Sequence, residues 1–258
     1  MILWIEARDT AVIALIVFAL CYIIAAVVFA VGIIVSQTRI AADLKATTPV
    51  MLTPLSVMTG LLIAFLGARV WSNVDHANAY VAQEASAISE STLLVNSLPE
   101  DTRNAVREGL KDYLRFVESE DWPAMLAGRA SFQQPPPGLT DAITALLAFV
   151  PSQPSQRVVQ DRVVMALEKA FEARRSRVLL SSAVIAPVQW LVILILDALV
   201  LITIVMVHLD RRATAAVNLF VFSTAVAASL VLLMVNDRPF SAGGLTVSPA
   251  VLRQIAID

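Results

Sequence analysis

Four long uncharged stretches dominate the pattern of apolar and polar residues along the chain. They cover residues 10–35, 46–68, 178–207 and 213–235, and only Asp197 interrupts the third of them. At about 1.5 Å per residue, a helix over any of these stretches crosses a hydrocarbon layer of roughly 30 Å. The pattern therefore predicts four transmembrane helices. In the second stretch we expect the helix to begin near Pro54, because a proline is best tolerated at a helix start.

The residues between the second and third stretches follow a different pattern. Apolar side chains recur there at three- and four-residue intervals with charged residues between them, which is typical of amphipathic helices on a solvated domain. Pro99, followed by two acids, indicates one helix start, residues 133–138 with three prolines a connector, and residues 139–150 a short helix. A last helix, capped at Ser155, is expected to continue directly into the third span.

Together these patterns predict an all-α membrane protein, with four transmembrane helices and a helical cytosolic domain inserted between the second and third. The expected divisions are residues 1–71 for the first two spans, 72–178 for the inserted domain, 179–236 for the last two spans and 237–258 for a C-terminal cytosolic tail. Strand patterns are nearly absent throughout.

Basic residues near the span ends set the expected orientation, because lysine and arginine there are retained in the cytoplasm. Arg174, Arg175 and Arg177 lie just before the third span. The opposite side of the membrane would carry only Arg39, Lys45, Arg211 and Arg212. We therefore expect a multi-pass protein with both termini and the inserted domain in the cytoplasm.

Composition agrees with this class and narrows the chemistry. Hydrophobic residues make up 58% of the chain and charged residues 16%, where an ordinary domain has about 25% charged. The net charge is only −2 and no basic block occurs, so nucleic acid is not an expected partner. The single cysteine and two isolated histidines predict no metal site, and no catalytic or cofactor-binding motif is visible. We expect neither an enzyme nor a cofactor.

Three segments resemble the bestrophin-like domain family, a bacterial family of membrane proteins. They are Leu52-Thr-Pro-Leu-Ser-Val-Met-Thr-Gly-Leu-Leu-Ile-Ala-Phe65, Gln83-Glu84-Ala85 and Asn236-Asp-Arg-Pro-Phe-Ser241. The family is similar to bestrophins, which are pentameric anion channels whose second transmembrane helix lines the pore and continues into a helical cytosolic domain. The resemblance implies a homo-oligomeric, pentameric channel for small inorganic ions in the lipid bilayer of the inner membrane. The arginine-containing segment after the bestrophin neck and the acidic calcium clasp are not matched residue by residue, so the ion and its gating stay open.

One face of the second span is the candidate pore wall. Leu61, Phe65 and Arg69 recur every four residues and would share that face. Phe65 would then be a constriction that gates by dewetting, and Arg69 would form a ring of charge at the cytoplasmic mouth. From the residues alone, ordinary packing of Phe65 and snorkelling of Arg69 to the interface are the simpler interpretation. The resemblance makes the pore equally plausible.

Two further sets of charged residues have candidate roles. Asp197 is an acid inside an apolar span, where it is either an ion or proton site or a protonated or hydrogen-bonded acid at a helix contact, with Gln189, Trp190 or Thr203 nearby. Glu84 and Glu90, beyond the second span, either line a vestibule or pair with Arg174 and Arg175. These five charged residues and the pore face of the second span are the candidate functional residues of the chain.

Two other functions are compatible with the residues. The chain could be a non-conducting membrane scaffold or sensor whose cytosolic helices bind a partner protein, which the amphipathic inserted domain favours. It could also be a transporter that couples a proton or cation through Asp197, although no inverted repeat is visible.

Overall fold

The computed structural model describes residues 10–39, 41, 49–133, 135–240 and 247–257, and these residues form helices, turns and loops without a strand. They belong to two compact units. The first unit comprises Met1–Ser72 and Val184–Asp237, and the second comprises Asn73–Ala183 and Arg238–Asp258. The prediction of an all-helical protein is confirmed.

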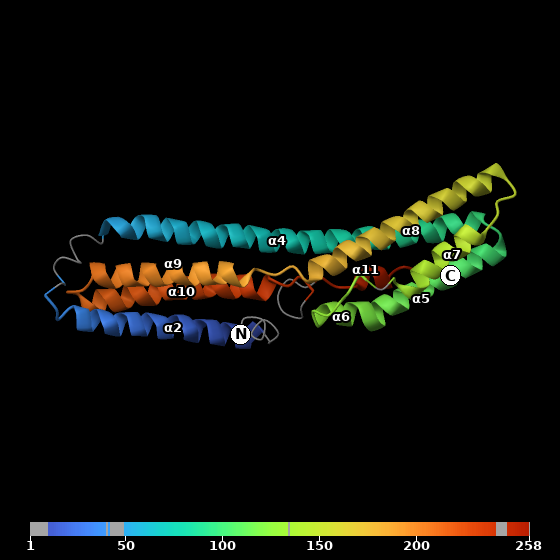
Figure 1. The fold of residues 1–258 in the computed structure, drawn as a ribbon. Coiled ribbons are helices and arrows are strands. Elements are labelled where there is room, and N and C mark those ends of the chain that lie inside the picture. Colours follow the sequence, from blue (N-terminus) through green and yellow to red (C-terminus); the bar gives the residue numbers. More distant parts are fainter. Residues whose placement is uncertain (1–9, 40, 42–48, 134, 241–246, 258) are drawn as a thin grey trace. The chain divides into compact units, whose positions relative to one another are not determined.

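The first unit contains α2 (Thr10–Val35), the beginning of α4 (Pro49–Leu94), α9 (Pro187–Val207) and α10 (Arg212–Asn236). Each of these helices is long and apolar enough to cross a membrane, as the uncharged stretches predict. In Figure 1, α2, α9 and α10 run side by side. The four predicted spans are therefore present as helices.

Apolar side chains from all four helices form the core of the first unit. Ile13 and Val17 of α2, Leu66 of α4, Ile193 of α9 and Leu230 of α10 are buried in one cluster. A second cluster, nearer the loops between α2 and α4 and between α9 and α10, includes Ala25, Val200, Leu209 and Leu219. A side-chain carbon at Gly32 would overlap Val205, so glycine permits the close approach of α2 and α9.

Helix α4 differs from its prediction at its start. It begins at Pro49, five residues before the expected position, and Pro54 lies inside it. Because a proline in the second turn removes only one backbone hydrogen bond, packing of the helix can offset that cost. The helix then continues to Leu94 without a break.

The second unit is built from the rest of α4 and from shorter helices. These are η1 (Val95–Ser97), α5 (Glu100–Phe116), η2 (Val117–Asp121), α6 (Trp122–Leu126), α7 (Pro137–Ala148), α8 (Pro154–Ser181) and α11 (Ala250–Arg253). The predicted start of α5 after Pro99 is confirmed. The predicted connector is shorter than expected, because Pro137 is the first residue of α7.

The expected continuous helix from the second unit into the third span is wrong. Helix α8 ends at Ser181 and α9 begins at Pro187. Pro187 lacks an amide hydrogen and restricts the residue before it, so a helix cannot pass through this point undisturbed. The intervening backbone is held by Asp237, whose carboxylate oxygens accept hydrogen bonds from the Ile185 amide at 2.9 and 3.1 Å.

The C-terminal residues expected as a tail take part in the core of the second unit. Val247 and Leu252 are buried there, and the ring of Phe240 packs edge-on against Trp122 with 5.5 Å between centroids. The Val247 amide donates a hydrogen bond to the Pro239 carbonyl at 2.9 Å. The glycines after Ser241 lie outside the described residues.

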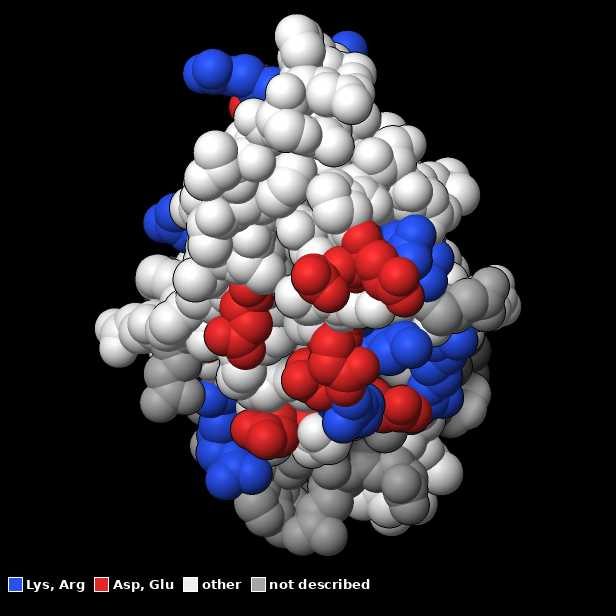
Figure 2. Space-filling model, turned by 90° about the vertical axis from the view of Figure 1, so that its right-hand side faces the viewer, with Lys and Arg blue, Asp and Glu red and all other residues white. Residues whose placement is uncertain are grey.

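Charges on the surface of the second unit are mixed. Figure 2 shows acidic and basic side chains interspersed on one face rather than gathered into a region of one sign. On α5, for example, Arg115 pairs with both Glu108 and Asp112, at 3.2 and 2.7 Å. Such exposed pairs contribute little to stability but keep this face hydrated.

Candidate functional site

The regular geometry of α4 places Leu61, Phe65 and Arg69 on one exposed face of the helix. Phe65 is 70% exposed and Leu61 52% exposed, while Arg69 is also open to solvent. Thr59 and Leu66, on the other side of the helix, are buried in the first unit. Among the described residues, Leu61 and Phe65 thus lie on a face of α4 that is largely left out of the packing of the first unit.

Arg69 is oriented by a neighbouring helix. Its Nη1 donates a hydrogen bond to Gln189 Oε1 at 3.2 Å, and the same oxygen accepts the Ala186 amide at 3.1 Å. Gln189 lies in the first turn of α9, so α9 positions the charge of Arg69. This contact is compatible both with a ring of charge at a pore mouth and with an arginine that snorkels to the interface.

Asp197 lies in the middle of α9 and is only 6% exposed. Neither of its carboxylate oxygens has a hydrogen-bond partner among the described residues. The neighbours suggested for it are occupied elsewhere or not bonded to it: Gln189 accepts from Arg69, and the Thr203 hydroxyl donates to the Leu199 carbonyl at 2.7 Å. Among the described residues, Asp197 therefore has no hydrogen bond to any of these neighbours, and a protonated acid at a helix contact stays a prediction.

Glu84 belongs to a buried ionic network in the second unit. Arg177 donates to Glu84 Oε2 from Nε at 2.8 Å and to Oε1 from Nη2 at 3.1 Å. The same Nη2 donates to Asp121 Oδ2 at 3.0 Å, and Arg174 donates to both Asp121 oxygens at 2.8 and 3.1 Å. Tyr113 completes the network by donating to Glu84 Oε1 at 2.6 Å. All five side chains are buried.

The predicted pairing of Glu84 and Glu90 with Arg174 and Arg175 is correct only in part. Glu84 and Arg174 each form a buried ion pair, but not with each other. Glu84 pairs with Arg177, and Arg174 pairs with Asp121. Glu90 forms no ion pair with any described residue and is only partly buried. Arg175 is exposed and lies over the ring of Phe132, 5.4 Å from its centroid. The reason is helical spacing: Arg174 and Arg177, three residues apart, face the core, and Arg175 points away.

The electrostatics of the network favour its charged form. Burial alone would lower the pKa of Arg177, but Glu84, Tyr113 and Asp121 outweigh burial and hold that pKa above its ordinary value. Burial first, and the Glu84 carboxylate second, raise the pKa of Tyr113 well above its ordinary value. The network thus holds a neutral tyrosine and paired charges at buried positions.

Sequence reasoning did not single out Tyr113, Asp121 or Arg177 as members of a network. Arg177 counted only toward orientation, and Tyr113 lies on the buried, apolar face of α5, where its hydroxyl gave no signal. Asp121 ends η2, a π-helical turn, and such turns are rare and often shift side chains at functional positions. No spacing in the sequence indicates this turn, so Asp121 carried no usable signal.

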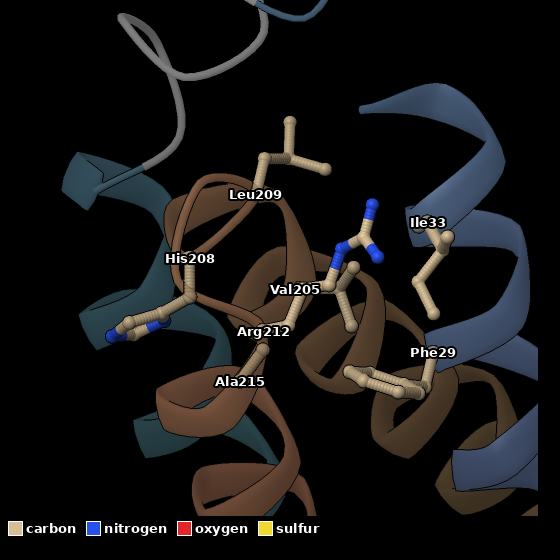
Figure 3. Close-up of a pocket in the computed structure, with 8 residues that line it drawn as sticks. Phe29, Ile33, Val205, His208, Leu209, Arg212 and Ala215 are labelled. Carbon is tan, nitrogen blue, oxygen red and sulfur yellow. The ribbon is translucent and has the colours of Figure 1, made fainter. Parts of the chain in front are cut away.

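A small pocket at the turn between α9 and α10 contains the second histidine. His208 uses both ring nitrogens, with Nδ1 2.9 Å from the Ile204 carbonyl and Nε2 3.3 Å from Asn218. Figure 3 shows the His208 ring turned away from Arg212, whose guanidinium extends toward Ile33 of α2. Across the part of the chain that the structure describes, no three histidine, cysteine or acidic side chains gather as metal ligands.

Comparison with known proteins gives one finding. A family model described as the bestrophin-like domain matches residues 13–252, nearly the whole chain. No curated protein and no solved structure matches the chain. The match and the four long apolar helices together indicate a multi-pass membrane protein.

Proposed function

The chain belongs to the bestrophin-like domain family, and on this premise we propose that it forms a homo-oligomeric ion channel in a bacterial inner membrane. Copies of the chain, five by resemblance to bestrophins, surround a pore lined by α4. Both termini and the second unit lie in the cytoplasm. The conducted species is a small inorganic ion, and conduction needs neither catalysis nor a cofactor.

The unpartnered face of α4 is the observation that carries this proposal. Phe65 and Leu61 are bulky apolar side chains left exposed by the chain's own packing, and Arg69 follows them one turn later. Around a symmetry axis, a ring of Phe65 side chains forms an apolar constriction that excludes water and ions when narrow. A ring of Arg69 at its cytoplasmic end raises the local concentration of anions.

Each unit contains one polar contact between α4 and a neighbouring helix. Gln189 holds the Arg69 guanidinium at 3.2 Å. Beyond the predicted membrane region, Arg177 of α8 binds Glu84 of α4 through two hydrogen bonds. Within each unit, α4 is thus bonded to a neighbouring helix of its own chain, which is compatible with a pore-lining role.

Ion flux through purified protein in liposomes tests this proposal. Liposomes that contain the protein should dissipate a salt gradient faster than empty liposomes, and the rate should increase with the amount of protein. Absence of flux with chloride, nitrate, sodium and potassium salts would contradict the proposal.

Non-conducting scaffolding is the second candidate, and one observation favours it. Leu147, Val150 and Val158 are large apolar side chains that remain exposed near the end of α7 and the start of α8. Such side chains are typical of a surface that binds another protein. A stoichiometric partner recovered with the intact protein, together with absence of flux, would favour this function over conduction.

A further inference from the structure

Asp197 is a buried acid of the first unit whose carboxyl group has no partner among the described residues. The residue is nine-tenths buried, and both of its oxygens are inaccessible to solvent and have no hydrogen-bond partner among the described residues. A carboxylate in such a place is unstable unless something neutralises it, since it has lost the hydration that it has in water.

A small cavity adjoins this carboxyl group. Asp197 lines it together with Cys21 and Ile24 of α2 and with Ser223 and Val226 of α10, and its volume is about 20 Å³. This volume admits a single group of the size of a water molecule. Ser223 is 2% exposed, and its hydroxyl also lacks a partner among the described residues. Two unsatisfied polar side chains therefore face the same small space.

The residues that the structure describes do not supply a positive charge to this cavity. None of its lining residues is basic, and Cys21 is the one titratable side chain besides Asp197 among them. No titratable residue occurs in α4 from Pro49 to Ala68. Arg69 is fixed on Gln189, which lies eight residues from Asp197 and hence about 12 Å away along α9.

A bound metal cation does not fit the donor set either. Hard cations such as Mg²⁺ and Ca²⁺ take six or more oxygen ligands. The cavity offers the two Asp197 oxygens and the Ser223 hydroxyl, and its volume leaves no room for a hydration shell. A proton is the cation that needs only one oxygen and no additional space.

We propose that this cavity is a proton site, in which Asp197 is a carboxylic acid hydrogen-bonded to Ser223 through one water molecule. The acid hydrogen and the serine hydroxyl then both have partners, and the second Asp197 oxygen is left as a neutral carbonyl instead of part of a charged carboxylate. Release of the proton to solvent leaves a carboxylate between α2, α9 and α10 and requires entry of water into the packed helices. Protonation thereby links the packing of these helices to pH, independently of whether α4 lines a pore.

Infrared spectroscopy of the purified protein in lipid tests the site directly. The wild type should show a carboxylic-acid carbonyl band at neutral pH that Asp197→Asn removes. Asp161→Asn, the same change at an exposed position of α8, should leave that band in place. Ser223→Ala should shift the band, because the hydrogen-bonded partner is lost, and this variant keeps the test valid if Asp197→Asn fails to fold.

Thermal unfolding gives an independent readout. Raising the pH should lower the unfolding temperature of the wild type and of Asp161→Asn more than that of Asp197→Asn, whose amide cannot release a proton. Two results would overturn the proposal. One is a spectrum without any acid band that depends on Asp197. The other is a stabilisation by Na⁺ over choline that Asp197→Asn abolishes, which would assign the site to a metal cation.

Discussion

Two arginines, two acids and a tyrosine in the second unit bind one another where solvent does not reach. Arg177 is shared by Glu84 and Asp121, and Arg174 takes the remaining positions on Asp121. Burying charges is costly, and their mutual attraction compensates only when each partner is present. The network is therefore sensitive to the loss of any one charge.

Replacing Arg177 by methionine should strongly destabilise the second unit. The change leaves Glu84 without its ion pair and Asp121 with Arg174 alone, and breaking a buried pair costs about 3–5 kcal/mol. Chemical unfolding followed by near-ultraviolet circular dichroism measures this loss. Arg175→Met is the matched control, because Arg175 is exposed and should change stability by less than about 1 kcal/mol. Equal effects of the two changes would contradict the role given to the network.

Tyr113→Phe should alter stability in a pH-dependent way. At neutral pH it removes the hydrogen bond to Glu84, at a cost of about 1–3 kcal/mol. Because the folded state raises the pKa of Tyr113, its contribution is present below the unfolded pKa of about 10 and is lost as pH rises above it. The wild type should therefore lose stability above pH 10 more steeply than Tyr113→Phe.

Unfolding free energies measured between pH 8 and 12 check this expectation, with Tyr80→Phe as the control. Tyr80 is partly buried, and its ring stacks on that of His76 with 6.1 Å between centroids. Its hydroxyl forms no hydrogen bond to an acidic side chain among the described residues. Parallel pH profiles for the wild type and Tyr113→Phe would show that Tyr113 does not hold its proton in the folded protein.

The sequence predicts the chemistry of these residues better than their partners. Glu84 was expected to pair with an arginine of the last cytosolic helix, and it does. A buried carboxylate is stable only beside an opposite charge, and α8 supplies one. Which arginine was not predictable, since the rotation of α8 depends on packing of residues far away in sequence. For Asp121 there was no signal, because the π-helical turn that presents it has no recognisable pattern.

At the scale of elements, the contact between α5 and α7 depends on two glycines. A side-chain carbon at Gly109 would lie 2.6 Å from the Gly138 carbonyl oxygen and 3.1 Å from Ala142 Cβ. A carbon at Gly138 would overlap the Gly109 carbonyl oxygen in turn. Since backbone atoms cannot move aside as a flexible side chain does, any larger residue separates the two helices.

Gly109→Ala should therefore destabilise the second unit by about 1–3 kcal/mol, as overpacking does elsewhere. Gly60→Ala provides the contrast, because nothing lies within 4 Å of the carbon that it would add on α4. That change should be neutral or stabilising by up to about 1 kcal/mol, through the better helix propensity of alanine. Thermal unfolding of both variants decides the point, and a stable Gly109→Ala would contradict the close helix contact.

Helix ends show where local signals succeed and fail. Pro99 with its following acids predicted the start of α5, because that signal is local and agrees with packing. The start of α4 at Pro49 and the break between α8 and α9 were not predicted. In the first case packing overrides the cost of Pro54. At the break between α8 and α9, the uncharged stretch continues across Pro187. We therefore expected one continuous helix there, although the proline itself indicated a helix boundary.

At the scale of the whole molecule, the four apolar helices and the family match indicate a membrane protein, and the exposed face of α4 supports a pore. Uncharged length was a reliable signal for the spans because the bilayer imposes it on any sequence. The arrangement of several copies around a symmetry axis imposes no comparable pattern on the sequence of one chain. The support for a pore within one chain is the exposure of Leu61 and Phe65 on α4.

Arg69→Glu should change ion selectivity. In the proposed channel it replaces a ring of positive charge by a negative one, so the reversal potential under a salt gradient should shift toward that of the cation. Arg175→Glu, at an exposed position of the second unit, should leave the reversal potential unchanged. If both variants keep the wild-type value, Arg69 does not face the conducted ion.

Current through planar bilayers, compared between the wild type and Phe65→Ala, tests the central claim most directly. Phe220→Ala on α10 is the matched control, because Phe220 is similarly exposed but stacks on Tyr22 of its own chain, 5.5 Å away. The account predicts a wild-type current that Phe65→Ala increases, since a smaller side chain widens and hydrates the constriction, and that Phe220→Ala leaves unchanged. No current in any salt, or equal currents from all three proteins, would contradict a pore constricted by Phe65.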